Sequence, residues 1–185
     1  MITSKEDLLY YLEQDRAANK ARSISSYWVT FHNYNKKMWN FLVYMRKCEY
    51  YTNVNGFLHK LLAKYYEVRK NALGGRLGFT IPINTFEEGL CIFHYGSIVV
   101  HTDARIGKNC YLIGDIFIGQ AEKPGVPVIG DNVGFGAGAK VIGPVHVGSN
   151  VTIGANAVVV KDVEDNVTVA GVPAKVIKRH PEKAS

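Results

Sequence analysis

Residues 129–158 decide the fold, because they divide into consecutive hexapeptides that read IGDNVG, FGAGAK, VIGPVH, VGSNVT and IGANAV. Each hexapeptide opens with an apolar residue and has an apolar or small residue at its fifth position. The same period continues outward from this stretch. Its first positions are Ile106, Leu112, Ile118, Ile129, Phe135, Val141, Val147, Ile153 and Val159, and its fifth positions are Cys110, Ile116, Val133, Ala139, Val145, Val151, Ala157 and Val163.

A period of six with two inward positions predicts a parallel β-helix, in which each repeat supplies one short strand and one turn. The second position is often glycine, which relieves crowding where the chain turns a corner. These glycines are Gly107, Gly119, Gly130, Gly136, Gly148 and Gly154. The step from Ile118 to Ile129 is longer than one repeat, so residues 120–128 should form a projecting loop of the kind that often carries function.

The residues before the repeats are predicted to be α-helical. Ser4-Lys5-Glu6-Asp7 has the spacing of a capping box and predicts the start of a helix that buries Leu8 and Leu12. Two further helices are indicated by apolar residues at helical spacing, and we expect both apolar faces to be buried. These faces are Tyr34, Met38, Phe41 and Met45 in one helix, and Phe57, Leu61, Tyr65 and Val68 in the other. Gly74 and Gly75 should end the last helix.

The composition supports a folded protein with two regions of different charge. The 185 residues include 11% aromatic side chains, which excludes disorder as the main state, and carry a net charge of +6. Residues 1–73 contain 12 Lys and Arg against 6 Asp and Glu, whereas the remaining 10 and 10 balance. The basic region predicts either an anionic partner, such as a membrane surface, nucleic acid or acidic polymer, or simply a solvated helical surface.

Cellular location and cysteine chemistry can also be predicted. No apolar run is long enough to span a membrane, and the first residues do not resemble a secretory signal, so we expect a cytoplasmic protein. The odd number and wide spacing of Cys48, Cys91 and Cys110 favour reduced thiols over disulfides or a zinc site.

The repeats, together with the terminal segment AGVPAK at 170–175, resemble the left-handed β-helix acyltransferases. Residues 92–100, IFHYGSIVV, narrow the resemblance to the serine acetyltransferase-like branch, which includes O-acetyltransferases of bacterial polysaccharides. The resemblance covers about residues 77–178. It implies a mainly β fold, with an α-helical domain at 1–73, a left-handed parallel β-helix at 74–169 and a cofactor-binding tail at 170–185. It also implies a homotrimer with acetyl-CoA between neighbouring β-helices, able to assemble further through the helical domain.

His94 is the predicted catalytic residue. Transfer of an acetyl group to an alcohol needs a general base, because an alcohol is a weak nucleophile near neutral pH. Extending the period backward from Ile106 reaches Val100 and then His94, so a polar ring would occupy an apolar position. A structural histidine is the alternative, but His94 matches the catalytic histidine of the family. The ring needs an orienting partner, for which Glu87, Glu88 and Asp103 are candidates.

Acetyl-CoA needs a surface of low bulk and cations near its phosphates. Small residues suited to the pantetheine arm are Gly119, Gly136, Ala137, Ala139 and Ala155. The resemblance places Lys161 and Lys175 near the phosphates and Pro173 near the adenine. No ATP- or NAD-binding glycine motif and no DNA-binding motif is present. A metal is not expected, because the close histidine pair of a trimeric β-helix carbonic anhydrase is missing.

The predicted acceptor is a hydroxyl of a capsular or surface polysaccharide, or of its sugar precursor. Serine acetyltransferases have an Asp before the catalytic His and an Arg-His pair in the inserted loop, whereas Phe93 and the pair Glu122-Lys123 stand here. A zwitterionic amino acid would then lack partners for its charges. We expect Phe93, Tyr95 and Lys123 to contact a sugar instead. The alternatives are a serine O-acetyltransferase of cysteine biosynthesis and a non-catalytic trimeric binding module.

Overall fold

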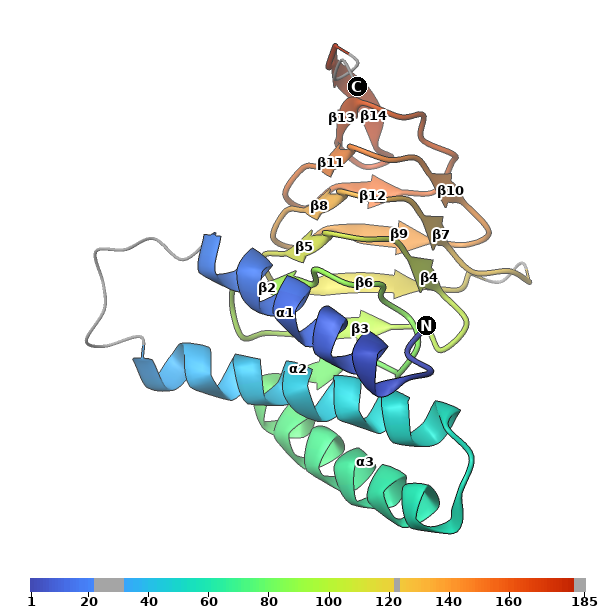
Figure 1. Ribbon diagram of the computed structural model, residues 1–185. Helices are drawn as coiled ribbons and strands as arrows, with labels where there is room; N and C mark the ends of the chain where they lie inside the picture. Colours follow the sequence, from blue (N-terminus) through green and yellow to red (C-terminus); the bar gives the residue numbers. More distant parts are fainter. Residues whose placement is uncertain (22–31, 122–123, 182–185) are drawn as a thin grey trace.

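The structure is a computed structural model and describes residues 1–21, 32–121 and 124–181 (Figure 1). Three helices come first: α1 (Lys5–Ala21), α2 (His32–Asn53) and α3 (Phe57–Leu77). Short strands follow and stack into a tapering column, with the helices at one end and the C-terminus at the other (Figure 1). No helix within the described ranges combines the length and the apolar character that a membrane crossing requires.

The column is built from three sheets whose strands run parallel, apart from the last. The first sheet contains β1 (Phe79–Thr80), β3 (Ile98–Val100), β6 (Ile116–Gly119), β9 (Lys140–Ile142) and β12 (Val158–Val159). The second contains β4 (Arg105–Ile106), β7 (Val128–Ile129) and β10 (His146–Val147). The third contains β2 (Cys91–Ile92), β5 (Tyr111–Leu112), β8 (Gly134–Phe135), β11 (Thr152–Ile153), β13 (Val167–Ala170) and the antiparallel β14 (Lys175–Arg179).

The predicted period of six is confirmed by burial. Every first and fifth position named above lies in the core of the column, and the largest exposed fraction among them is 8%, at Val163. Glycines at the second position are required by the stacking of the coils. A Cβ added to Gly136 would lie 2.6 Å from the backbone nitrogen of Ala155 in the next coil, and one added to Gly130 would lie 2.8 Å from the carbonyl carbon of Gly148.

The predicted start of the first helix is also confirmed. The backbone N–H of Asp7 donates to the hydroxyl of Ser4 at 3.0 Å, and the N–H of Ser4 donates to the Asp7 carboxylate at 2.9 Å. This reciprocal pair is the predicted capping box. In α2, Met38, Phe41 and Met45 are buried as expected. The side chain of Tyr34 lies outside the described part of the structure.

The predictions for α3 are wrong in two respects. Its predicted apolar face is exposed, because α3 packs on α2 through the opposite face; helical spacing shows which residues share a face but not which face is covered. The helix also continues through Gly74 and Gly75 and ends at Leu77, with Gly78 in the left-handed conformation at φ 81°. Gly74 serves close packing instead, since a Cβ there would lie 2.7 Å from the carbonyl oxygen of Phe79.

A buried ionic cluster joins the helices to the first coil. Arg46 donates to Asp15 at 2.8 Å, to Glu49 at 3.0 Å and to the carbonyl oxygens of Phe86 and Glu87 at 2.7 Å each. Burial disfavours the guanidinium charge, but the two carboxylates outweigh it and raise the pKa of Arg46 above its ordinary value. The cluster therefore clamps the segment that leads into β2.

Candidate active site

His94 lies at a corner of the column, between β2 of the third sheet and β3 of the first. Ile92 pairs with Leu112, and Val100 pairs with Ile118, so the first coil has two more residues at this corner than the next coil. The prediction that His94 occupies an apolar position is therefore wrong: Ile92 fills that position and is 2% exposed. The His94 side chain is exposed instead, where it can meet a dissolved substrate.

The equivalent corners of later coils stack directly above His94. A Cβ added to Gly114 would lie 3.8 Å from the Cβ of His94. The N–H of Gly138 donates to the carbonyl of Gly114 at 2.9 Å, and the N–H of Asn156 donates to the carbonyl of Ala137 at 2.8 Å. We call this stack, residues 93–97, 113–115, 136–138 and 154–156, the His94 corner.

Several predicted site residues meet at the His94 corner. Gly136 is half-buried, and Ala137 and Ala155 are exposed with side chains no larger than a methyl group. Pro173 follows β13 and extends the same stack, because the N–H of Val158 donates to Gly171 at 3.0 Å. This line of small residues leaves the backbone accessible, which fits an extended pantetheine chain. Lys175 is exposed beside Ala170, at the upper end of the line.

Phe93 and Tyr95, which precede and follow His94 in the chain, both pack against other residues of the column. The Phe93 ring lies 6.4 Å from the His94 ring and packs edge-on against Tyr111 at 6.1 Å. Tyr95 is partly buried and packs against the core of the column. Their packed positions give the histidine two aromatic neighbours with limited freedom.

Other predicted site residues lie elsewhere. Gly119 is buried at the end of β6, and exposed Lys161 follows β12, so both belong to the next corner, between the first and second sheets. The prediction that Ala139 contacts the donor is wrong for its side chain, which is fully buried in the core because it holds a fifth position of the repeat. Lys123 lies outside the described residues.

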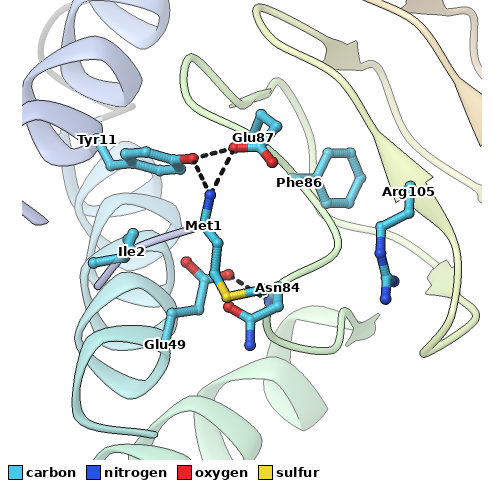
Figure 2. A pocket seen from close by; sticks show the side chains of 8 residues that line it. All are labelled: Met1, Ile2, Tyr11, Glu49, Asn84, Phe86, Glu87 and Arg105. Atoms are coloured by element: carbon cyan, nitrogen blue, oxygen red, sulfur yellow. Dashed lines mark hydrogen bonds and ion pairs between the residues drawn. The ribbon is translucent and has the colours of Figure 1, made fainter. Parts of the chain in front are cut away.

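The acidic candidates for orienting His94 have other partners. Glu87 accepts a hydrogen bond from the Tyr11 hydroxyl and pairs with the Met1 ammonium at 3.3 Å (Figure 2). Glu88 pairs with Lys108 at 3.1 Å, and Asp103 lies 3.8 Å from Nδ1 of His101. These contacts give each carboxylate a cation or histidine outside the His94 corner.

Asp115 is a charged residue of the His94 corner that the sequence analysis missed. It is exposed, and its Oδ1 accepts a hydrogen bond from the N–H of Ser97 at 3.0 Å. The backbone of Asp115 is in the left-handed region, at φ 54°. Asp115 stands at the fourth position of its repeat, where asparagine is frequent. An acidic residue at that position, one coil after His94, was the available signal.

The cavity drawn in Figure 2 is separate from the His94 corner. It lies between α1, α2 and residues 84–87, and its volume is about 60 Å³. That volume holds only a water molecule or two, and of the predicted site residues only Glu87, a candidate for orienting His94, lines it. Within the described ranges, no group of three or more His, Cys, Asp or Glu side chains is placed to hold a metal ion.

Comparison with known proteins identifies relatives of this chain. The family described as "Bacterial transferase hexapeptide (six repeats)" matches residues 127–161. The serine acetyltransferase of Synechococcus elongatus is 37% identical over 109 residues, which cover 57% of this chain but only 41% of that protein. The serine acetyltransferase of Staphylococcus aureus strain Mu50 is 28% identical over 183 residues, or 95% of this chain and 78% of that protein.

Solved structures of serine acetyltransferases have a similar fold. Serine acetyltransferase from Brucella abortus strain S19 superposes with a TM-score of 0.77 at 24% identity, over 96% of this chain and 72% of that one. Its complex with coenzyme A has a TM-score of 0.75 at 26% identity, over 96% and 70%. The chain is thus similar in sequence and in fold to serine acetyltransferases, and residues 127–161 match the hexapeptide-repeat family. It spans less than half of the cyanobacterial relative.

These relatives can be compared with each of the predicted functions. They agree with the prediction of an acetyltransferase, and the coenzyme A complex agrees with the predicted donor. The prediction of a polysaccharide acceptor is wrong, because the relatives are serine acetyltransferases and thus match the alternative. That prediction depended on side chains that are missing directly before His94 and in the inserted loop, whereas Asp115 comes to the His94 corner from the next coil.

Proposed function

We propose that this chain is a serine O-acetyltransferase that takes its acetyl group from acetyl-CoA. The observation that carries the proposal is an exposed histidine at the His94 corner of a chain that matches a serine acetyltransferase over 95% of its length. His94 would remove the hydroxyl proton while the serine oxygen attacks the thioester carbonyl. A new C–O bond forms, the C–S bond breaks, and the histidine returns the proton to the leaving thiolate.

The donor would lie along the His94 corner. Ala137 and Ala155 keep this surface low, so a pantetheine chain can approach the backbone. Lys175 stands at the upper end of the same line, where an ammonium would pair with phosphate. Pro173, between these residues and Lys175, would contact the nucleotide end.

The acceptor would sit beside His94. Phe93 and Tyr95 form its walls, and the exposed carboxylate of Asp115 would pair with the ammonium group of serine. This assignment supplies one of the two charge partners that the sequence lacks at the positions used by serine acetyltransferases.

We further propose a left-handed β-helix that assembles as a homotrimer. Gly119 and Lys161 lie on the next corner of the column, away from His94 in the same chain. A neighbouring copy could bring that corner opposite His94 and complete the donor groove. The single-chain geometry favours this arrangement because the predicted donor residues divide between two corners.

Replacement of His94 tests the proposal. The His94→Ala variant should lose a factor of about 10² or more in kcat with acetyl-CoA and L-serine, measured by thiol release, while its KM for acetyl-CoA changes little. His146→Ala is the matched control, because His146 is an exposed histidine on the second sheet. Wild-type turnover in His94→Ala would refute the role of the base, and no acetyl transfer to serine by the unaltered chain would refute the acceptor.

A further inference from the structure

α3 carries a row of exposed apolar side chains on its outer face. Phe57 is 80% exposed, Leu58 66%, Leu61 58%, Tyr65 53% and Val68 56%. Their spacing places them on one side of the helix. We call these five residues the α3 apolar row. Exposed apolar groups this close together favour a partner surface.

The opposite face of α3 is already covered by α2. The Tyr66 ring stacks on Tyr51 at 5.5 Å, and the Cys48 thiol donates to the carbonyl of Ala63 at 3.7 Å. The α3 apolar row therefore points away from the rest of the described chain. In Figure 1, α3 lies at the end of the molecule opposite the C-terminus.

Basic residues border the α3 apolar row on both sides. At 100° per residue, Lys60 and Lys64 follow one border, and Arg69 and Arg76 follow the other. All four are exposed. Glu67 is the acidic residue of α3, and it pairs with Lys64 at 2.8 Å, so that the border with Lys60 keeps one net positive charge. The outer face of α3 is thus apolar along its centre and positively charged along its edges.

The charge pattern disfavours a second copy of α3 as the partner. If two α3 helices met through their apolar rows, the borders would lie side by side in either relative direction. Each border is basic, so Lys and Arg of one copy would face Lys and Arg of the other across about 10 Å. An anionic surface has no such repulsion.

We propose that α3 docks the protein onto an anionic lipid bilayer. The α3 apolar row would enter the boundary between headgroups and acyl chains, and Lys60, Arg69 and Arg76 would contact the headgroups, while Lys64 stays paired with Glu67. The helix would lie in the plane of the membrane surface without crossing it. This inference does not depend on the proposed reaction, because α3 contributes no residue to the His94 corner.

Vesicle sedimentation with the full chain tests the proposal. Vesicles of phosphatidylcholine containing about 30% phosphatidylglycerol should bind the protein, and vesicles of phosphatidylcholine alone should bind at least about tenfold more weakly. Leu61→Ser should weaken binding by about tenfold, since it removes a large apolar side chain from the contact. Leu9→Ser is its control, because Leu9 is a helical leucine that is 59% exposed on α1.

A second pair of variants separates position from net charge. Lys60→Glu with Arg76→Glu should weaken binding to anionic vesicles by more than about 25-fold, at roughly fivefold for each lost basic residue. Lys36→Glu with Lys37→Glu changes the net charge equally on α2 and should weaken it much less. Equal losses in both pairs, or no binding to anionic vesicles, would overturn the proposal. A smaller oligomer for Leu61→Ser in analytical ultracentrifugation, without vesicle binding by the unaltered chain, would assign α3 to a protein interface instead.

Discussion

Replacement of Arg46 by methionine should be the most destabilising single change in the helical region. Methionine has similar length but no charge and no donor. Arg46 is fully buried, and so is Asp15, while Glu49 is 1% exposed. The substitution would leave two carboxylates in the interior without their shared cation, and the carbonyls of Phe86 and Glu87 without their donor.

The expected loss is about 4 kcal/mol. Removing one partner of a buried ion pair costs roughly 3–5 kcal/mol, because the remaining charge stays buried and unpaired. The two carbonyl groups that lose their donor add to this cost. Water that enters the space left by the guanidinium group would offset part of the sum. For a chain of this size, each kcal/mol lowers Tm by about 2–4 °C, so the shift should be about 8–16 °C.

Urea unfolding followed by circular dichroism measures this loss. Arg16→Met is the matched control, because Arg16 is exposed on α1, and it should change the free energy of unfolding by less than about 0.5 kcal/mol. Asp15 also accepts hydrogen bonds from the N–H groups of Gly89 and Leu90, at 2.8 and 2.9 Å. The destabilised clamp should therefore loosen the segment before β2 and lower turnover at His94. A loss below about 1 kcal/mol in Arg46→Met would refute the reasoning that the cluster clamps this segment.

Three further outcomes are expected. Lys175→Glu should raise the KM for acetyl-CoA about tenfold with little change in kcat, whereas Lys178→Glu on the same strand should not; equal effects would make Lys175 a general surface charge. Asp115→Asn should raise the KM for serine about tenfold without affecting that for acetyl-CoA, and Asp131→Asn, which also removes a carboxylate that accepts a backbone N–H, is its control. The backbone and hydroxyl of Thr3 and the N–H of Ser4 lower the pKa of Asp7 below its usual 3.8, so its stabilising effect is present above about pH 4 and lost as pH falls through the folded pKa. Asp7→Asn should thus be less stable than the unaltered chain at neutral pH, with the difference closing in urea unfolding as the pH falls below the folded pKa; a constant difference would contradict the assignment.

The repeat core could be predicted because its signal is local and redundant. Each coil repeats the same two inward positions, so a single irregular residue does not obscure the period. The position of His94 could not be counted in this way. Two additional residues at one corner moved it out of the apolar series, and strand pairing revealed them. The proposed role of His94 therefore depends on its motif and not on its register.

The sequence alone determined the stacked parallel coils, the helical preface, the capping box at Ser4 and Asp7, and the small residues of the His94 corner. Each of these follows from neighbours within a few positions. Only the tertiary structure decided which face of α3 is covered, that Gly74 permits close packing, and that Asp115 lies on the corner of His94. These features depend on contacts between residues far apart in the chain, and a period or a spacing describes which side chains share a face without stating what that face meets.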